Sequence, residues 1–154
     1  MINPFVYYRI DSLNDLKRDA SASVRELDWH ADLAAIQRFY ARFTDMPILP
    51  PEDQTVGPPL AIMSRDDIVS FAVPFSFHEG ETEIGAVATV PDERNKGLCK
   101  ALIAGMAFRI LSEGKAATLT TENTNLPMQR AAEAIGMTRL PKGAGLKNTE
   151  QAEE

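Results

Sequence analysis

Several residue types are scarce in this chain of 154 residues, and each scarcity excludes a class of protein. Cys99 is the single cysteine, so an internal disulfide framework is excluded and a reducing cytoplasm is expected. His30 and His78 show no ligand spacing, so no metal site is predicted. The longest strongly apolar stretch, residues 102–111, contains Arg109 and is too short to cross a bilayer. The first residues lack a basic region followed by an apolar one, so no secretory signal is expected.

Positive charge is also in the minority, because 16 Lys and Arg residues face 22 Asp and Glu residues and leave a net charge of −6. A general nucleic-acid binder needs a basic face that displaces counterions, so no nucleic-acid partner is expected, and no membrane partner either. A local basic cluster of Arg94, Lys96 and Lys100 nevertheless allows an anionic ligand. The acidic surroundings weakly favour a cationic second partner such as an amine.

Apolar periodicity and turn residues predict an alternation of strands and helices. Prolines between residues 46 and 59 forbid long regular structure, so this segment is either a wall of a site or an ordinary connection. The order predicts an α+β or three-layer α/β domain with one mixed sheet flanked by helices. The expected elements are a strand at 5–10, a helical turn at 12–18, a strand at 24–27, a helix at 30–44, strands at 60–64, 68–77 and 82–90, a helix at 97–113, a strand at 115–121, a helix at 125–136 and a short strand at 137–140.

The junction between the strand at 82–90 and the helix at 97–113 is the most informative segment. A tight turn into a helix N-terminus leaves backbone N–H groups unpaired, and together with the helix dipole they form a site suited to a diphosphate. Gly97 has no Cβ to hinder a phosphate, and Lys96 and Lys100 add positive charge. The same residues also fit an ordinary strand-to-helix turn with exposed basic side chains.

The segment 83–99 resembles the coenzyme-binding motif of the GNAT superfamily of N-acetyltransferases, in which a strand ends in proline and Gln/Arg-x-x-Gly-x-Gly/Ala opens a helix. Asn125, followed by Gly136 and Met137, is similar to a second signature of that family, an asparagine that starts a helix ending in Gly-Phe. Residues 24–36 are similar to the usual opening strand and helix. The resemblance extends over about residues 22–140.

The resemblance implies a GNAT fold, with a mixed, mostly antiparallel sheet whose central strands, 82–90 and 115–121, splay apart. It divides the chain into an N-terminal extension at 1–21, an acyl-CoA-binding catalytic domain at 22–141 and a flexible acidic tail at 142–154. Little chain remains after Met137 for the final hairpin of that fold. We therefore hypothesise that the strand at 5–10 takes the missing place, in its own subunit or in the partner of a homodimer.

The resemblance further implies acetyl-CoA as co-substrate, with its pantetheine arm between the splayed strands and no metal ion. Asn125 is expected to orient the arm, although its position also suits a helix N-cap. Cys99 stands where the motif has glycine or alanine, and it is either a packing residue or a reactive thiol. The implied coenzyme contacts are Val87, Thr89, Val90, Arg94, Asn95, Lys96, Gly97, Leu98, Cys99, Lys100, Asn125 and Met128.

The implied chemistry is attack of an amine on the thioester, with Glu83, Ala88 and Asn125 as catalytic residues. An amide near Ala88 would stabilise the oxyanion, and Glu83 would remove a proton from the amine, with Glu81 the weaker candidate. Both glutamates equally suit solvated ends of a hairpin. Ala132 stands where many GNAT members carry a tyrosine that protonates the departing CoA sulfur. Tyr40 on the first predicted helix could take this role only if its side chain reaches the site.

Two functions remain open from the sequence. The first is an acyltransferase that moves an acetyl or other short acyl group from acetyl-CoA to a primary amine of a small molecule or peptide. The second is an acyl-CoA-binding sensor or scaffold that has lost catalysis, as the departures at Cys99 and Ala132 suggest. Loss of the tyrosine does not exclude catalysis. CoA can leave as a thiolate, and because its thiol has a pKa near 8.5 this costs only about 2 kcal/mol at neutral pH.

Overall fold

The computed structural model describes residues 4–17, 23–45, 49–52 and 55–141. Part of the proline-rich loop at 46–59 and the whole predicted tail at 142–154 lie outside these residues. The elements in chain order are β1 Phe5–Ile10, a 3-10 turn at Leu13–Asp15, β2 Arg25–Glu26, α1 Leu33–Tyr40, β3 Leu60–Ser64, β4 Asp67–His78, β5 Glu81–Thr89, a 3-10 turn at Pro91–Glu93, α2 Leu98–Ser112, β6 Ala116–Glu122, α3 Leu126–Ala134 and β7 Thr138–Arg139.

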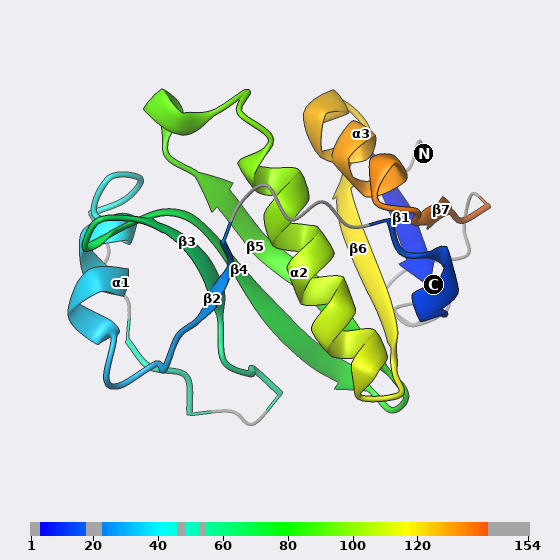
Figure 1. The fold of residues 1–154 in the computed structure, drawn as a ribbon, viewed down its shortest axis with the longest axis horizontal. Coiled ribbons are helices and arrows are strands. Elements are labelled where there is room, and N and C mark those ends of the chain that lie inside the picture. The colour runs from blue at the N-terminus through cyan, green and yellow to red at the C-terminus, as the bar shows by residue number, and fades with distance from the viewer. Residues whose placement is uncertain (1–3, 18–22, 46–48, 53–54, 142–154) are drawn as a thin grey trace.

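The strands form one sheet of seven, in the order β2-β3-β4-β5-β6-β1-β7. Every neighbouring pair is antiparallel except β5 and β6, which are parallel and are joined by α2 (Figure 1). This connection follows the rule that parallel neighbours need a long crossover. The predicted α+β class and the mixed, mostly antiparallel sheet are therefore confirmed.

The N-terminal strand β1 is an interior strand of this sheet. It lies between β6 and β7, with Tyr8 paired to Leu119 on one side and to Arg139 on the other. The buried Tyr8 hydroxyl donates to Glu133 of α3 at 2.7 Å. The hypothesis that residues 5–10 complete the sheet is confirmed, and they do so within their own chain.

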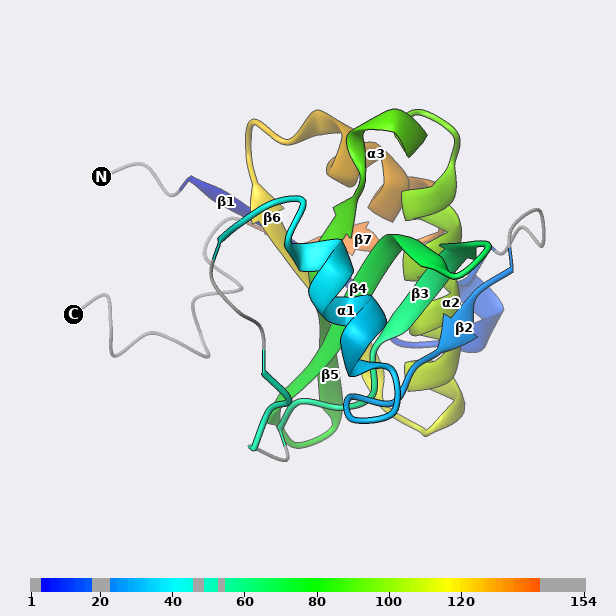
Figure 2. The ribbon, with the colours of Figure 1, turned by 90° about the vertical axis from the view of Figure 1, so that its left-hand side faces the viewer.

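The helices cover both faces of the sheet. Figure 2 shows α1 on one side of β3 and β4 and α2 on the other. Leu102, Ile103 and Met106 of α2 are fully buried, which explains why this helix is apolar around most of its circumference. On the opposite face, the Phe39 ring of α1 lies 5.5 Å from that of Phe71 of β4. The core therefore has two layers, with the sheet between them.

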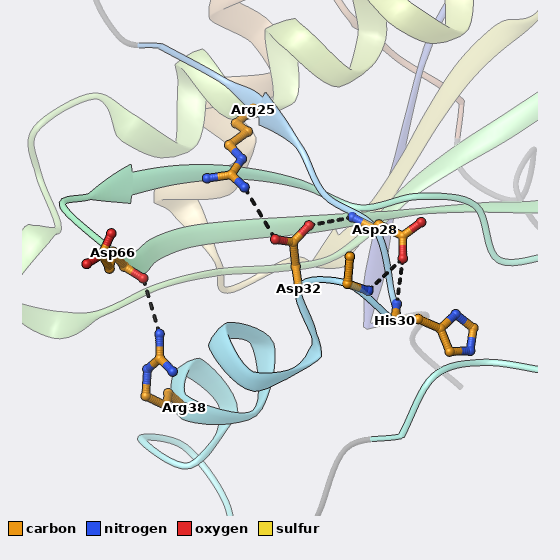
Figure 3. Close-up of polar contacts among 7 residues, drawn as sticks. Arg25, Asp28, His30, Asp32, Arg38 and Asp66 are labelled. Carbon is orange, nitrogen blue, oxygen red and sulfur yellow. Dashed lines mark hydrogen bonds and ion pairs between the residues drawn. The ribbon is translucent and has the colours of Figure 1, made fainter.

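Helix α1 is shorter than the 30–44 predicted, because side chains hold the chain before it in a turn. Asp28 Oδ1 accepts from the N–H groups of His30 and Ala31, both at 2.8 Å, and these bonds hold the pKa of Asp28 below its usual range. Asp32 accepts from the Asp28 N–H at 2.8 Å and pairs with Arg25 at 3.3 Å (Figure 3). These local bonds compete with helical ones, so regular helix begins only after Asp32.

Candidate coenzyme and acceptor site

The turn between β5 and α2, where the sequence predicted an anion site, leaves a series of backbone amides free. Asn95 and Gly97 have left-handed φ values of 66° and 79°. Within the described part of the chain, no backbone carbonyl accepts from the N–H groups of residues 95–100, and the ladder resumes at Ala101, whose N–H donates to the Gly97 oxygen. These donors lie at the positive end of a helix of 15 residues. A Cβ at position 97 would meet no atom within 4 Å, so the approach is open.

The cationic side chains of this turn are bound to the protein itself. Arg94 Nε donates to the Thr89 carbonyl oxygen at 3.0 Å, and Lys96 Nζ pairs with Glu93 at 3.1 Å. Lys100 is half-buried on the first turn of α2. The donors that face an incoming anion without rearrangement are therefore the backbone amides rather than the side chains.

The parallel strands β5 and β6 separate before they end. Their pairing covers only residues 81–84 and 116–119, and its last pair is Ile84 with Leu119. Beyond that pair, β5 continues along β4 and β6 continues along β1. Within the described residues, the strand edges at 85–89 and 120–122 thus face each other with no strand between them. This gap between the strand edges, called the splay below, extends from the β5–α2 turn to the Ile84–Leu119 pair.

A bulge on β5 decides which backbone groups face the splay. The register shifts between the pairs Val73–Gly85 and Phe71–Ala88, and Ala86 adopts a left-handed φ of 50°. The Val90 N–H donates to Val69 of β4, so by alternation the Ala88 amide also points toward β4. This direction is wrong for the predicted oxyanion role of Ala88. The amides on either side, those of Val87 and Thr89, point toward the splay.

Asn125, Met128 and Cys99 lie on the two helices that border the site. Asn125 Oδ1 accepts from the Met128 N–H at 3.2 Å, so the N-cap reading is confirmed, and its amide nitrogen has no partner in the described residues. Cys99 Sγ lies 3.9 Å from Met128 Sδ. Burial raises the pKa of the Cys99 thiol to about 11, so it is a packing residue and not a reactive thiolate.

No tyrosine of α1 or α3 stands ready to protonate a departing sulfur. Ala132 is fully buried, with an exposed fraction of 0%, and its methyl group has no proton to give. Tyr40 packs edge-on against Phe39 and Phe71 with centroids 5.5 Å apart in each case, and burial raises its pKa. The packing role of Tyr40 is the one that the structure shows.

Glu83 of β5 is a half-buried carboxylate. Burial is the main cause of its raised pKa, and the negative charge of Glu81 adds to it. A hydrogen bond from the Thr120 hydroxyl and the nearby His78 lower the pKa in part. Glu81 is held by Arg9 of β1, whose Nη1 lies 2.7 Å from its Oε2. A carboxylate with a raised pKa is suited to proton transfer near neutral pH.

Two aromatic rings lie beside Glu83 on the same face of the sheet. Phe75 is directly opposite Glu83 in the β4–β5 pairing, and its ring covers Gly85, where a Cβ would come within 2.7 Å of it. Phe77 stacks on Phe75 at 5.5 Å and is 60% exposed. Sequence reasoning missed Arg9 and Thr120, because only the register of β1 and β6 brings them beside β5.

The described residues contain no group of three or more His, Cys, Asp or Glu side chains placed to hold a metal ion. Within the same part of the chain, no helix is both long and apolar enough to cross a membrane.

Comparison with known proteins agrees with this geometry. The sequence model of the FR47-like family matches residues 63–143, which include the β5–α2 turn and the splayed strands. The chain belongs to the FR47-like family, within the GNAT superfamily. The match spans both signatures that the sequence resembled, the coenzyme turn and the helix that begins after Asn125. No protein of curated function matches the chain.

Solved structures of GNAT proteins share the fold at low sequence identity. A GNAT-family protein from Novosphingobium aromaticivorans has a TM-score of 0.71 at 16% identity, over 89% of this chain and 60% of its own. The ribosomal-protein alanine N-acetyltransferase from Escherichia coli has a TM-score of 0.59 at 18% identity, over 74% and 76%. AAC(6')-Iy, solved with a bisubstrate analogue of CoA and acetylneamine, has a TM-score of 0.58 at 16% identity, over 76% and 90%. The chain spans 52% to 60% of the lengths of four GNAT structures that match 88% or 89% of it.

Proposed function

We propose that this FR47-like protein transfers an acetyl or other short acyl group from acyl-CoA to a primary amine. The observation that carries the proposal is that two features, the free amides after β5 and the splay between β5 and β6, lie next to each other. Free amides at residues 95–100 suit a diphosphate, and the splay that starts beside them suits an extended arm. An ordinary strand-to-helix turn would need only the first feature.

In this proposal, the backbone of β5 binds the coenzyme arm as a further strand would. The Val87 and Thr89 amides face the splay, and Asn125 contributes its free amide nitrogen from the other side. We assign the oxyanion-stabilising N–H to Val87 in place of Ala88, because the Ala88 amide is directed at β4. The cofactor is acetyl-CoA used as a co-substrate, and no step calls for a metal ion.

Glu83 is the proposed base for the acceptor amine. It lies on the face of the sheet opposite to α2, one residue before the last β5–β6 pair. Its raised pKa makes it a better proton acceptor than an ordinary surface carboxylate while it is ionised. The second candidate function is a CoA-binding module without catalysis, which the fully buried Ala132 favours because the usual acid is missing.

Calorimetry and turnover together test the two candidates. We expect CoA and acetyl-CoA to bind with heat at micromolar to low millimolar concentrations, and acetyl-CoA to be consumed with at least one amine from a panel. The panel contains polyamines, aminoglycosides, amino acids and peptide N-termini, since the structures that share the fold include one solved with a CoA–acetylneamine analogue and a ribosomal-protein alanine N-acetyltransferase. CoA binding without product from any amine would favour the binding module. The absence of heat at millimolar CoA would refute both.

A further inference from the structure

The two faces of the sheet differ at the splay, and only one of them is open to an acceptor within the described residues. Helices α2 and α3 lie side by side over one face (Figure 1), and Cys99 of α2 is 3.9 Å from Met128 of α3. Glu83, the proposed base, lies on the other face. The acceptor amine therefore approaches the splay from the face that carries Glu83.

Two stacked aromatic rings lie on this same face. Phe75 follows Phe71 by four residues, and the Phe71 ring packs against Phe39 of α1, so alternation along β4 places Phe75 on the side opposite to α2. The Phe77 ring lies 5.5 Å from the Phe75 ring, with 12° between their planes, and Phe77 is 60% exposed. The pair thus presents a flat apolar surface on which a further ring can pack.

Gly85 allows the Phe75 ring to lie against β5. The φ of Gly85 is outside the left-handed region, so its backbone conformation does not require glycine. A Cβ at this position would instead come within 2.7 Å of one atom of the Phe75 ring and 2.8 Å of another. Gly85 stands between Glu83 and Val87 on β5. The ring therefore lies between the proposed base and the N–H group proposed for the oxyanion, where an acceptor must bind.

The backbone beneath the rings is held on its second edge as well. The Gly57 N–H donates to the Pro74 carbonyl oxygen at 3.0 Å, and the Ser76 N–H donates to the Thr55 carbonyl oxygen at 2.7 Å. These bonds fix β4 on both sides of Phe75. A surface that is already ordered loses little conformational entropy when it binds a ligand.

The charges beside the rings favour a cation and not a carboxylate. Glu83 pairs with Thr118 of β6, which pairs in turn with Arg9 of β1, so the three residues share a face. The Arg9 guanidinium lies 2.7 Å from Glu81 and 2.8 Å from Asp11, and it is therefore not free to bind a carboxylate of the acceptor. The half-buried Glu83 attracts an ammonium group and repels a carboxylate.

Resting on the acyl transfer proposed above, we propose that the acceptor is a primary amine that carries an aromatic ring and no carboxylate. Phe75 and Phe77 receive the ring, and Glu83 receives the ammonium group. The amine nitrogen forms the C–N bond, and the C–S bond breaks with its electron pair on sulfur. The two protons that the ammonium group loses pass through Glu83 to water. Phe77 thus determines acceptor specificity and takes no part in proton transfer.

Two matched pairs of amines test the acceptor class with the unsubstituted protein at saturating acetyl-CoA. Phenethylamine and butylamine are both monocations and differ in the ring. Phenylalaninol and phenylalanine have nearly the same shape and differ in the carboxylate. We expect kcat/KM to be at least about tenfold higher for phenethylamine than for butylamine, and for phenylalaninol than for phenylalanine.

Replacement of the exposed ring tests the assignment to Phe77. We expect Phe77→Ala to raise KM for phenethylamine by about tenfold, while KM for butylamine and the calorimetric Kd for CoA stay within about twofold. Phe77→Tyr retains the ring and should keep the KM values of the parent protein. Phe108→Ala is the control, since Phe108 is 41% exposed on α2, on the other side of the sheet, and it should change neither KM.

A merely structural role for Phe77 gives a different result, because its loss would lower kcat with both amines alike. Equal kcat/KM values within either pair of amines, or equal changes in KM for phenethylamine and butylamine in Phe77→Ala, overturn the acceptor class and leave the proposed acyl transfer intact. If Phe77→Ala does not fold, Phe77→Leu is compared with Phe77→Tyr by the same KM criterion. Absence of turnover with every amine tested overturns the acyl transfer and the acceptor class together.

Discussion

At the scale of one residue, burial of Glu83 suits the proposed role of a base but lowers the stability of the fold. Burial raises its folded-state pKa above the ordinary 4.5, so protonation stops base catalysis at a higher pH than for an exposed glutamate. We expect Glu83→Gln to lower kcat by at least about a hundredfold on the plateau and to abolish the acid limb. The pH dependence of kcat with acetyl-CoA and the best amine measures this effect. A retained acid limb in the variant would remove Glu83 from the role of base.

The same substitution has an expected effect on stability with the opposite sign. Because the pKa is higher in the folded state, ionised Glu83 destabilises the fold at neutral pH, and this cost disappears as the pH falls below 4.5. Glu83→Gln should therefore unfold at an equal or higher temperature than the parent protein at pH 7. Glu81→Gln is the comparison, since it removes a neighbouring negative charge and the ion pair with Arg9, and it should move the acid limb to lower pH without abolishing it.

At the scale of an element, the β5–α2 turn depends on backbone conformation and on helix polarity together. Gly97 has a φ of 79° and open space around its Cα, so both Asn and Asp fit there at a cost of about 1 kcal/mol. The two side chains have nearly the same shape and differ in charge. We expect Gly97→Asp to weaken CoA binding by at least about tenfold more than Gly97→Asn, because the carboxylate repels a diphosphate.

Calorimetric Kd values and urea midpoints of both Gly97 variants provide the comparison. Gly80, in the β4–β5 turn, has a φ of 82° and equally open surroundings far from the N-terminus of α2. Gly80→Asp should therefore lose similar stability but retain its affinity for CoA. Equal CoA affinities of Gly97→Asn and Gly97→Asp would show that the diphosphate lies elsewhere.

At the scale of the whole molecule, the N-terminal segment contacts two parts of the fold: β1 pairs within the sheet, and the residues after it contact the C-terminal end of α3. After β1 the chain crosses Gly136, where a Cβ would clash with the Asp15 carbonyl oxygen, and the Lys17 N–H donates to the Ile135 oxygen at 2.8 Å. We expect Gly136→Ala to reduce the free energy of unfolding by more than about 2 kcal/mol, because a backbone contact cannot yield as a side chain does.

Urea denaturation is the measurement, and Gly114→Ala is its control. Gly114 has a φ of 82°, and a Cβ at this position would meet no atom within 4 Å, so alanine there should cost only about 1 kcal/mol. Because β1 also carries Arg9 to Glu81, loss of the N-terminal contact should change kcat as well as stability. Equal losses in the two variants would show that the segment is not held at Gly136.

The amino-acid sequence by itself determined most of the elements and the turn between β5 and α2. Alternating apolar residues predicted β3, β4 and β5, and Gly97 after a strand predicted the turn with free backbone amides, because both depend on neighbouring residues only. The extent of α1 was less accurate, since the Asp28 and Asp32 side chains compete locally with helical bonds. The likeness of residues 83–99 and 125–137 to a known family added the splay, which no local pattern shows.

Only the tertiary structure decided what surrounds the proposed chemistry. The register of β6 against β1 and β5 brings Arg9 to Glu81 and Thr118 beside Glu83 from distant parts of the chain, and a one-residue slip would place these side chains on the other face. The bulge at Ala86 changes the register of β5 against β4, and the pairing that follows it directs the Ala88 amide at β4 and away from the splay. Hydrogen-bond direction and strand register arise from pairing between distant segments, and a single sequence does not contain that pairing in any local pattern.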